Sequence, residues 1–234
     1  MLYVLPSDKA DFCMRIFNTD GSEAEMCGNG IRCFARYIYD YGLTEKTEFT
    51  VETGAGILVP KLHVKDGTVT SITVDMGEPI LAGDDIPVAG FGRERVIAKP
   101  IEVDGKGFTM TCVSMGNPHC VVFVEDMAKA ELEHFGPLFE SHEVFPRKTN
   151  TEFVEVRDSS HVRMRVWERG AAITLACGTG SCATVVAGVL NGKTERKTEV
   201  ELDGGKLLVE WSESDNHVYM TGPAEFVFEG TCTV

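Results

Sequence analysis

The chain has 234 residues, 43% of them hydrophobic and 25% charged, which is enough to bury a sizeable core in one large domain or two small ones. Its 22 Lys and Arg residues face 36 Asp and Glu residues, so the net charge at pH 7 is −14. This acidity argues against nucleic acids and anionic membranes as partners. Because no segment has the pattern of a membrane span or a signal peptide, we expect a soluble, cytoplasmic protein.

The first motif along the chain is a short glycine loop, Cys27-Gly28-Asn29-Gly30. Apolar residues follow it with the spacing of one helix face, at Ile31, Phe34, Ala35 and Ile38. We therefore predict a helix over residues 28–40 that begins at the loop. Glycines there let backbone N–H groups approach a ligand closely, while a helix N-terminus favours an anion and lowers the pKa of a nearby thiol.

Strands are predicted after this helix. Residues 57–64 and 69–74 flank the turn dipeptide Asp66-Gly67 and form a hairpin pattern, in which Pro60 indicates an edge position. Segment 76–79 is the expected crossing between two halves of the chain.

A near copy of the first loop occurs at Cys177-Gly178-Thr179-Gly180. Apolar residues again follow with helical spacing, at Cys182, Val185, Val186, Val189 and Leu190. For one such loop alone, a buried core cysteine beside a tight turn is the simpler interpretation. The duplication favours two reactive thiols, one in each half, that serve a single site.

The other predicted strands surround this second loop. Alternating residues predict a strand with one buried face over 162–167. Residues 199–202 and 206–211 form a second hairpin pattern, and residues 217–221 and 225–228 add two strands.

These elements predict an α+β fold of two pseudo-symmetric halves, each an antiparallel sheet wrapped around a central helix. We expect the N-terminal half to comprise residues 1–76 plus 225–234, and the C-terminal half residues 77–224.

The eight cysteines are expected to be reduced, because the sequence lacks a secretory signal. The local pairs Cys27/Cys33 and Cys177/Cys182 are spaced more widely than the C-x2-C pairs common in zinc and redox sites, so we expect no metal site. The remaining cysteines are predicted to be structural, with Cys33 and Cys182 packed in the core: Cys13, Cys33, Cys112, Cys120, Cys182 and Cys232.

Three ordered motifs resemble the diaminopimelate epimerase family. They are Asn18-Thr19-Asp20-Gly21-Ser22 leading to Met26-Cys27-Gly28-Asn29-Gly30, then Gly116-Asn117-Pro118-His119, and finally Trp167-Glu168-Arg169-Gly170 leading to Ala176-Cys177-Gly178-Thr179-Gly180. The resemblance extends over essentially the whole chain. It implies a cofactor-free enzyme that interconverts LL- and meso-diaminopimelate, a small diamino diacid of the lysine and cell-wall pathway.

This chemistry needs a base on one face of the α-carbon and an acid on the other. Cys27 and Cys177 are our candidates, because a thiol with a pKa near about 8.5 is easily tuned to either role. By resemblance, the backbone amides of four residues would stabilise the carbanion: Gly28, Asn29, Gly178 and Thr179.

The second amino-acid head of a diamino diacid needs an anionic and a cationic partner. The family pattern assigns the ammonium to Glu168 and the carboxylate to Arg169. It adds Asn18, Asn117 and Asn150 as assisting residues. Without that pattern, Glu168 and Arg169 would be interpreted as an exposed ion pair at a strand end. His119 either orients a thiol or proton or is a structural group in a turn.

The sequence departs from the family pattern in two places. It lacks the family's N-terminal segment with a Gly-Leu-Gly-Asn-Asp-Phe-like motif, and also a later Gly-Ala-Asp-Gly-like motif. We therefore expect the helix over 28–40 to be partly uncovered, which favours aggregation or pairing with another chain, for example as a homodimer. A misassigned start, a gene fragment and a weakened enzyme all fit this departure. In addition, Ala172-Ile173 stands where many relatives have Gly-Glu.

Three other hypotheses stay open at this point. A related cofactor-independent racemase or isomerase of the proline racemase or phenazine type would share the architecture, but its smaller substrate would leave Glu168 and Arg169 unused. An inactive truncated homologue would keep the fold without a complete site. A thiol redox protein is disfavoured by the cysteine spacing.

Overall fold

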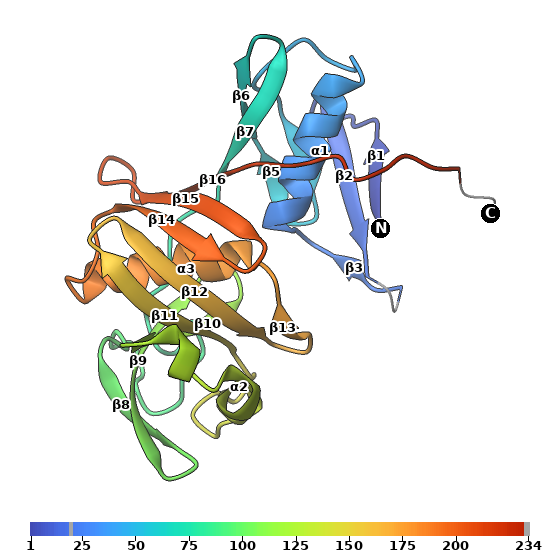
Figure 1. The fold of residues 1–234 in the computed structure, drawn as a ribbon. Coiled ribbons are helices and arrows are strands. Elements are labelled where there is room, and N and C mark those ends of the chain that lie inside the picture. Colours follow the sequence, from blue (N-terminus) through green and yellow to red (C-terminus); the bar gives the residue numbers. More distant parts are fainter. Residues whose placement is uncertain (19–20, 232–234) are drawn as a thin grey trace. The chain divides into compact units, whose positions relative to one another are not determined.

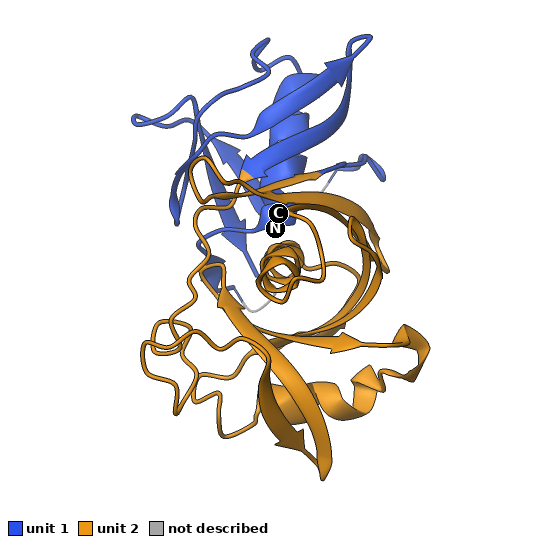
Figure 2. Ribbon diagram, turned by 90° about the vertical axis from the view of Figure 1, so that its left-hand side faces the viewer, with its two compact units in different colours: residues 1–74, 222–234 blue, residues 75–221 orange. Residues whose placement is uncertain are grey.

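The structure is a computed structural model that describes residues 1–18 and 21–231. The chain divides into two compact units, residues 1–74 with 222–234 and residues 75–221 (Figure 2). The expected crossings at residues 76 and 224 lie within a few residues of these limits, and the assignment of the halves as domains stays a prediction.

Unit 1 contains a small mixed sheet (Figure 1). Its strands are β1 (Leu2–Leu5), β2 (Phe12–Phe17), β3 (Glu23–Ala24), β4 (Val51–Thr53) and β5 (Gly56–Leu58). They lie in the order β1-β2-β4-β5, with β3 paired to β2, and β2 and β4 run parallel. A hairpin that is not part of this five-stranded sheet joins β6 (Lys61–Lys65) to β7 (Thr68–Asp75) through the predicted turn at Asp66 and Gly67. Pro60 separates β5 from β6, so the single strand expected over 57–64 is wrong, because each part pairs with a different neighbour.

The helix of unit 1, α1 (Gly28–Asp40), has the predicted bounds. Its predicted apolar face is buried, with Ile31, Phe34, Ala35 and Ile38 each no more than 1% exposed. Cys33 is exposed, so the expectation that it packs in the core is wrong. Cys33 lies two residues beyond Ile31, which turns its side chain away from the buried stripe.

Unit 2 is built on a long mixed sheet (Figure 1). Its strands lie in the order β16-β15-β14-β12-β11-β10-β9-β8, with β13 paired to β12. They are β8 (Lys99–Val103), β9 (Lys106–Ser114), β10 (Pro118–Val124), β11 (Asn150–Asp158), β12 (His161–Glu168), β13 (Ala172–Thr174), β14 (Lys197–Leu202), β15 (Gly205–Trp211) and β16 (Val218–Gly222). Two pairs are parallel, β10 with β11 and β12 with β14, so the expectation of purely antiparallel sheets is wrong in both units.

The strands of unit 2 curve around α3 (Gly178–Leu190), which Figure 2 shows end-on within the orange unit. The predicted buried face of β12 is confirmed, since Val162, Met164 and Val166 are at most 2% exposed. Together with side chains of α3 such as Val185 and Val186, they form the main core of this unit. Cys182 is fully buried there, as predicted. A sheet wrapped around one central helix is thus the architecture of this unit.

Two further segments differ from the sequence-based expectation. Residues 225–228 form no strand, because the segment lies along α1, where Arg36 contacts the Ala224 carbonyl oxygen and the Glu225 carboxylate. An additional helix, α2 (Leu132–Glu140), follows the short 3-10 helix η1 (Met127–Lys129) and packs Phe139 against Phe153 of β11. Its nine residues carry too short a pattern to be recognised from periodicity alone.

The described helices include none that is long and apolar enough to span a membrane.

Candidate active site

Cys27 is the N-cap residue of α1. Its Sγ accepts a hydrogen bond from the Gly30 N–H at 3.3 Å, in the way that a serine or aspartate oxygen usually caps a helix. A Cβ on Gly30 would lie 3.3 Å from the Cys27 Cβ and 3.4 Å from both the Ile16 and Leu2 side chains. A glycine at this position therefore lets the loop close tightly against β1 and β2.

Arg32 supports the glycine loop of unit 1 through hydrogen bonds. Its guanidinium, in a residue only 7% exposed, donates to the Asn29 Oδ1 at 3.0 Å, to the Gly28 carbonyl at 3.1 Å and to the Pro223 carbonyl at 3.2 Å. Sequence reasoning missed this residue, because an arginine between two apolar positions reads as solvent-exposed. Its contacts fix the Asn29 side chain beside the free amides of the helix N-terminus.

Asn18, the other predicted site residue of unit 1, lies just after β2 and donates from Nδ2 to the Ser22 hydroxyl at 3.0 Å. Thr19 and Asp20 of the same motif lie outside the described residues, as does Cys232.

Cys177 caps α3 in unit 2 by the same geometry. Its Sγ accepts from the Gly180 N–H at 3.4 Å and lies 3.5 Å from the Thr179 hydroxyl. Burial raises the pKa of the Cys177 thiol well above its usual range, the negative charge of Glu168 raises it further, and the contacts with Thr179 and Gly180 oppose them. The cost of burying a thiolate therefore outweighs the lowering expected at a helix N-terminus.

A chain of buried polar contacts lies beneath Cys177. His119 Nδ1 is 2.7 Å from the Glu152 Oε1, and His119 Nε2 is 3.0 Å from the Asn117 Oδ1. Both His119 and Glu152 have fully buried side chains. A Cβ on Gly180 would lie 2.7 Å from the Glu152 Oε1, so the first turn of α3 packs directly on this carboxyl group.

Sequence reasoning missed Glu152. In an alternating strand it looks like a residue of the solvent face, and only the parallel pairing of β10 with β11 brings it beside His119.

Asn150 links two of the predicted motifs. Its Nδ2 donates to the Pro118 carbonyl at 2.8 Å, and its Oδ1 accepts from the Arg169 backbone N–H at 2.9 Å. The Arg169 guanidinium donates to the Arg147 carbonyl at 3.1 Å, and Glu168 accepts from the Thr174 hydroxyl. Their described contacts are therefore with other residues and not with each other, so the interpretation of an exposed Glu168–Arg169 ion pair is wrong.

The topology explains why these residues gather. The first residues of β10 and β11 lie beside the last residues of β12, on the side of the sheet where these strand ends meet. The pairs His119 with Asn150 and Thr151 with Trp167 show this. Unit 2 thus collects most of the predicted site beside the N-terminus of α3: Asn117, His119, Asn150, Glu168, Arg169, Cys177, Gly178 and Thr179. The other predicted residues belong to unit 1: Asn18, Cys27, Gly28 and Asn29.

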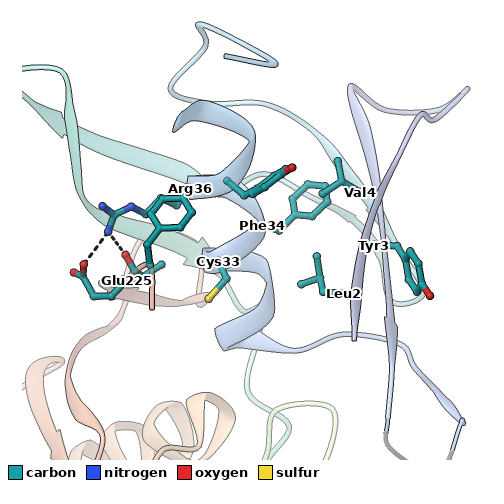
Figure 3. Close-up of a pocket in the computed structure, with 10 residues that line it drawn as sticks. Leu2, Tyr3, Val4, Cys33, Phe34, Arg36 and Glu225 are labelled. Carbon is teal, nitrogen blue, oxygen red and sulfur yellow. Dashed lines mark hydrogen bonds and ion pairs between the residues drawn. The ribbon is translucent and has the colours of Figure 1, made fainter. Parts of the chain in front are cut away.

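A separate pocket of about 540 Å³ lies in unit 1 along α1 and β1 (Figure 3). Its lining includes Leu2, Cys33 and Phe34, with Arg36 and Glu225 paired at its rim at 3.1 Å. None of the predicted site residues lines it, so it is distinct from the loop that Cys27 caps.

Comparison with known proteins agrees with the motifs. A family model described as diaminopimelate epimerase matches residues 1–82 and 111–227. Diaminopimelate epimerase of Agathobacter rectalis is 58% identical over 236 residues, covering 98% of this chain and 83% of the relative. That of Desulfitobacterium hafniense is 59% identical over 230 residues, covering 98% and 81%.

Solved structures extend the likeness to the fold. A phenazine biosynthesis protein from Bacillus anthracis has a TM-score of 0.66 at 21% identity, covering 94% of this chain and 80% of that one. A hydroxyproline epimerase from Agrobacterium vitis has a TM-score of 0.69 at 17% identity, covering 94% and 70%. At such identities the likeness concerns the fold alone. The high identity to the first two proteins and the family match decide the question: the chain belongs to the diaminopimelate epimerase family and is an epimerase.

Proposed function

We propose that this chain interconverts LL- and meso-2,6-diaminopimelate by proton transfer between two cysteines, without pyridoxal phosphate, in the synthesis of lysine and peptidoglycan precursors. The observation that carries the proposal is the matched pair of N-caps. Cys27 and Cys177 each accept from a glycine N–H three residues on, at the start of a 13-residue helix. Two thiols in equivalent local geometry suit a reaction that needs one acid and one base.

The environments of the two thiols suggest their starting roles. Burial and the charge of Glu168 raise the pKa of Cys177, so we assign it the protonated thiol form and the role of acid in the first half-reaction. Cys27, which is less buried, is then assigned the role of the base that removes the α-proton. The α-proton passes to the Cys27 sulfur, and the Cys177 proton passes to the opposite face of the carbon. The roles exchange for the reverse direction.

The α-carbanion is stabilised in this proposal by backbone amides. The first N–H groups of a helix have no partner within the helix and carry its positive dipole end. Gly28 and Asn29 open α1, and Gly178 and Thr179 open α3. In known enzymes, each oriented donor at a developing negative charge stabilises the transition state by about 3 to 4 kcal/mol. These amides can therefore provide much of the carbanion stabilisation that an electron-withdrawing cofactor supplies in other enzymes.

The second amino-acid head is assigned to the edge of the unit 2 sheet. Arg169 offers a planar guanidinium for a carboxylate, and Glu168 offers a carboxylate for an ammonium. The hydrogen bond from the Arg169 backbone to Asn150 supports this assignment, because it ties the end of β12 to the start of β11. Asn18 and Asn117 complete the proposed substrate contacts. The cytoplasmic location and the homodimer expected from the sequence stay predictions.

The experiment is isotope exchange. In deuterated buffer the purified protein should incorporate deuterium at the α-carbon of LL-diaminopimelate while forming the meso isomer. Cys27→Ser and Cys177→Ser should each lower the epimerisation rate by several orders of magnitude, because a hydroxyl is far less acidic than a thiol. Cys33→Ser is the matched control, since Cys33 lies on α1 but is exposed and caps nothing. Wild-type turnover in either serine variant would contradict the two-thiol mechanism.

A further inference from the structure

The side chain of Glu152 is fully buried, and its two carboxyl oxygens differ in their hydrogen-bond partners. Oε1 lies 2.7 Å from His119 Nδ1, whereas Oε2 has no hydrogen-bond partner among the described residues. An ionised carboxylate needs donors on both oxygens, so leaving one bare in a dry interior carries a large desolvation cost. A neutral acid with its O–H on Oε1 leaves only a carbonyl oxygen bare, and that costs much less. The geometry favours the neutral acid.

The surroundings of Glu152 act in the same direction. Burial raises the pKa of Glu152 and the charge of Glu168, at the end of β12, raises it further, although His119 opposes both. The other titratable groups beside it are Cys120 on β10 and Cys177 at the start of α3, and neither supplies a positive charge. The first turn of α3 lies directly on the carboxyl group, which keeps it in a low-dielectric site. Buried carboxylic acids in such sites act as hydrogen-bond donors at neutral pH.

A donor at Glu152 fixes what His119 does on its other side. If Oε1 donates its hydrogen to Nδ1, the neutral ring carries its own hydrogen on Nε2. That hydrogen is donated to the Asn117 Oδ1 at 3.0 Å. Because Oδ1 is then engaged, the NH2 group of Asn117 is turned away from the ring. Asn117 is half-buried at the turn between β9 and β10, at the edge of the sheet where the proposed substrate contacts gather.

We propose that Glu152 is a positioning residue: as a neutral buried acid it donates a hydrogen bond to His119, and through His119 it holds the Asn117 amide with its NH2 group facing the substrate. The inference rests on the proposed function for the role of Asn117 as a substrate contact. It adds to the site a residue that touches neither the substrate nor the reacting atoms.

The test combines infrared spectroscopy with kinetics of the full chain. The wild type at neutral pH should show a protonated-carboxyl C=O stretch that disappears in Glu152→Gln. Because a glutamine NH2 can donate to His119 Nδ1 as the acid does, Glu152→Gln should keep the KM for diaminopimelate within about threefold. Glu152→Leu should raise KM about tenfold, the loss expected for one hydrogen bond, with a smaller change in kcat.

Kinetics measured below the melting temperature separate positioning from a structural role. Glu152→Leu leaves the buried His119 Nδ1 without its partner and should lower Tm, so its KM is measured at a temperature where the variant is fully folded, and a positioning role predicts a raised KM in that folded protein. If Glu152→Leu does not fold, the more adaptable Glu152→Met takes its place. Glu155→Gln is the matched control on the same strand: its carboxylate accepts from the Met127 N–H and pairs with Arg157, so the protonated-carboxyl band and KM should both stay unchanged.

Two results would overturn the inference. One is a wild-type minus Glu152→Gln spectrum without a protonated-carboxyl band. The other is a folded Leu or Met variant with the wild-type KM. If the wild type fails to epimerise diaminopimelate, the proposed function is wrong. The infrared band would still show whether Glu152 is the buried donor.

Discussion

The two glycine loops have the same local chemistry but different surroundings. Cys177 is 5% exposed at the start of α3, which is buried on nearly every side by the curved sheet of unit 2. Cys27 is half-buried at the start of α1, which buries one apolar stripe and leaves Cys33 and Tyr37 exposed. The sequence of each loop determines that its cysteine caps the helix. The burial that the surrounding sheet provides determines the free-energy cost of forming a thiolate there. One repeated motif can in this way provide both an acid and a base.

A methyl group added to each loop should affect the two units very differently. In Gly180→Ala the new Cβ would lie 2.7 Å from the buried Glu152 Oε1, whereas in Gly30→Ala its nearest contacts are 3.3 to 3.4 Å away. We expect Gly180→Ala to lower the free energy of unfolding by about 3 kcal/mol through overpacking. For Gly30→Ala, mild crowding is offset by about 1 kcal/mol of helix propensity, so its net effect should be under about 1 kcal/mol.

Urea denaturation of both variants against the wild type measures this difference. Equal losses for the two alanine variants would show that the two loops are packed alike, contrary to the structure.

The support behind each loop offers a second test. Unit 1 relies on the charged side chain of Arg32, which donates to Gly28, Asn29 and Pro223. Arg32→Met keeps the aliphatic packing but removes the donors and leaves buried carbonyl groups unpaired, so we expect a loss of about 2 kcal/mol in the free energy of unfolding. Arg36→Met is the matched control one turn further along α1, where the partners are a more exposed segment. If both variants lose the same amount, the specific role of Arg32 in supporting the loop is wrong.

A third test compares the reactivity of the two thiols directly. Only the thiolate is alkylated, and the raised pKa of Cys177 means that its thiolate forms at higher pH than that of an ordinary cysteine. At pH 7 to 8 we therefore expect iodoacetamide to modify the half-buried Cys27 faster than Cys177, whose thiol is almost fully buried and is held in its protonated form. Labelling of Cys177 should keep rising with pH into the alkaline range.

Peptide mass spectrometry in a Cys33→Ser background, which removes the exposed thiol, follows both sites at once. Faster modification of Cys177 than of Cys27 at neutral pH would reverse the assignment of acid and base.

Local patterns in the sequence predict much of this fold. Both helices begin at their glycine loops as expected, because periodic apolar residues after a capping residue depend on few long-range contacts. What could not be predicted depends on partners far along the chain. The segment 225–228 has a strand-like composition but is held against α1 by Arg36, and the parallel pairing of β10 with β11 has no local signature.

The site divides in the same way. Motifs identify Cys27 and Cys177, and in unit 2 the structure pairs Asn117 with His119 and Asn150 with the Arg169 backbone. Glu152 and Arg32 could not be predicted, because each has the local pattern of an ordinary surface residue in its own segment. Only burial by other elements shows that they support the loops.

The smallest effect concerns Ala172, the first residue of β13. The structure gives it φ of 60°, in the left-handed region that costs an L-residue with a Cβ about 1 kcal/mol or more. Its neighbours on β13 and the end of β12 lead into the Cys177 loop, so the strain is adjacent to the site. Ala172→Gly should raise the free energy of unfolding by up to about 1 kcal/mol, reduced by the greater freedom of glycine in the unfolded chain. Thermal melting measures the gain, with Ala171→Gly as the control because Ala171 does not have positive φ. A lower Tm for Ala172→Gly would mean that the turn tolerates the alanine without strain.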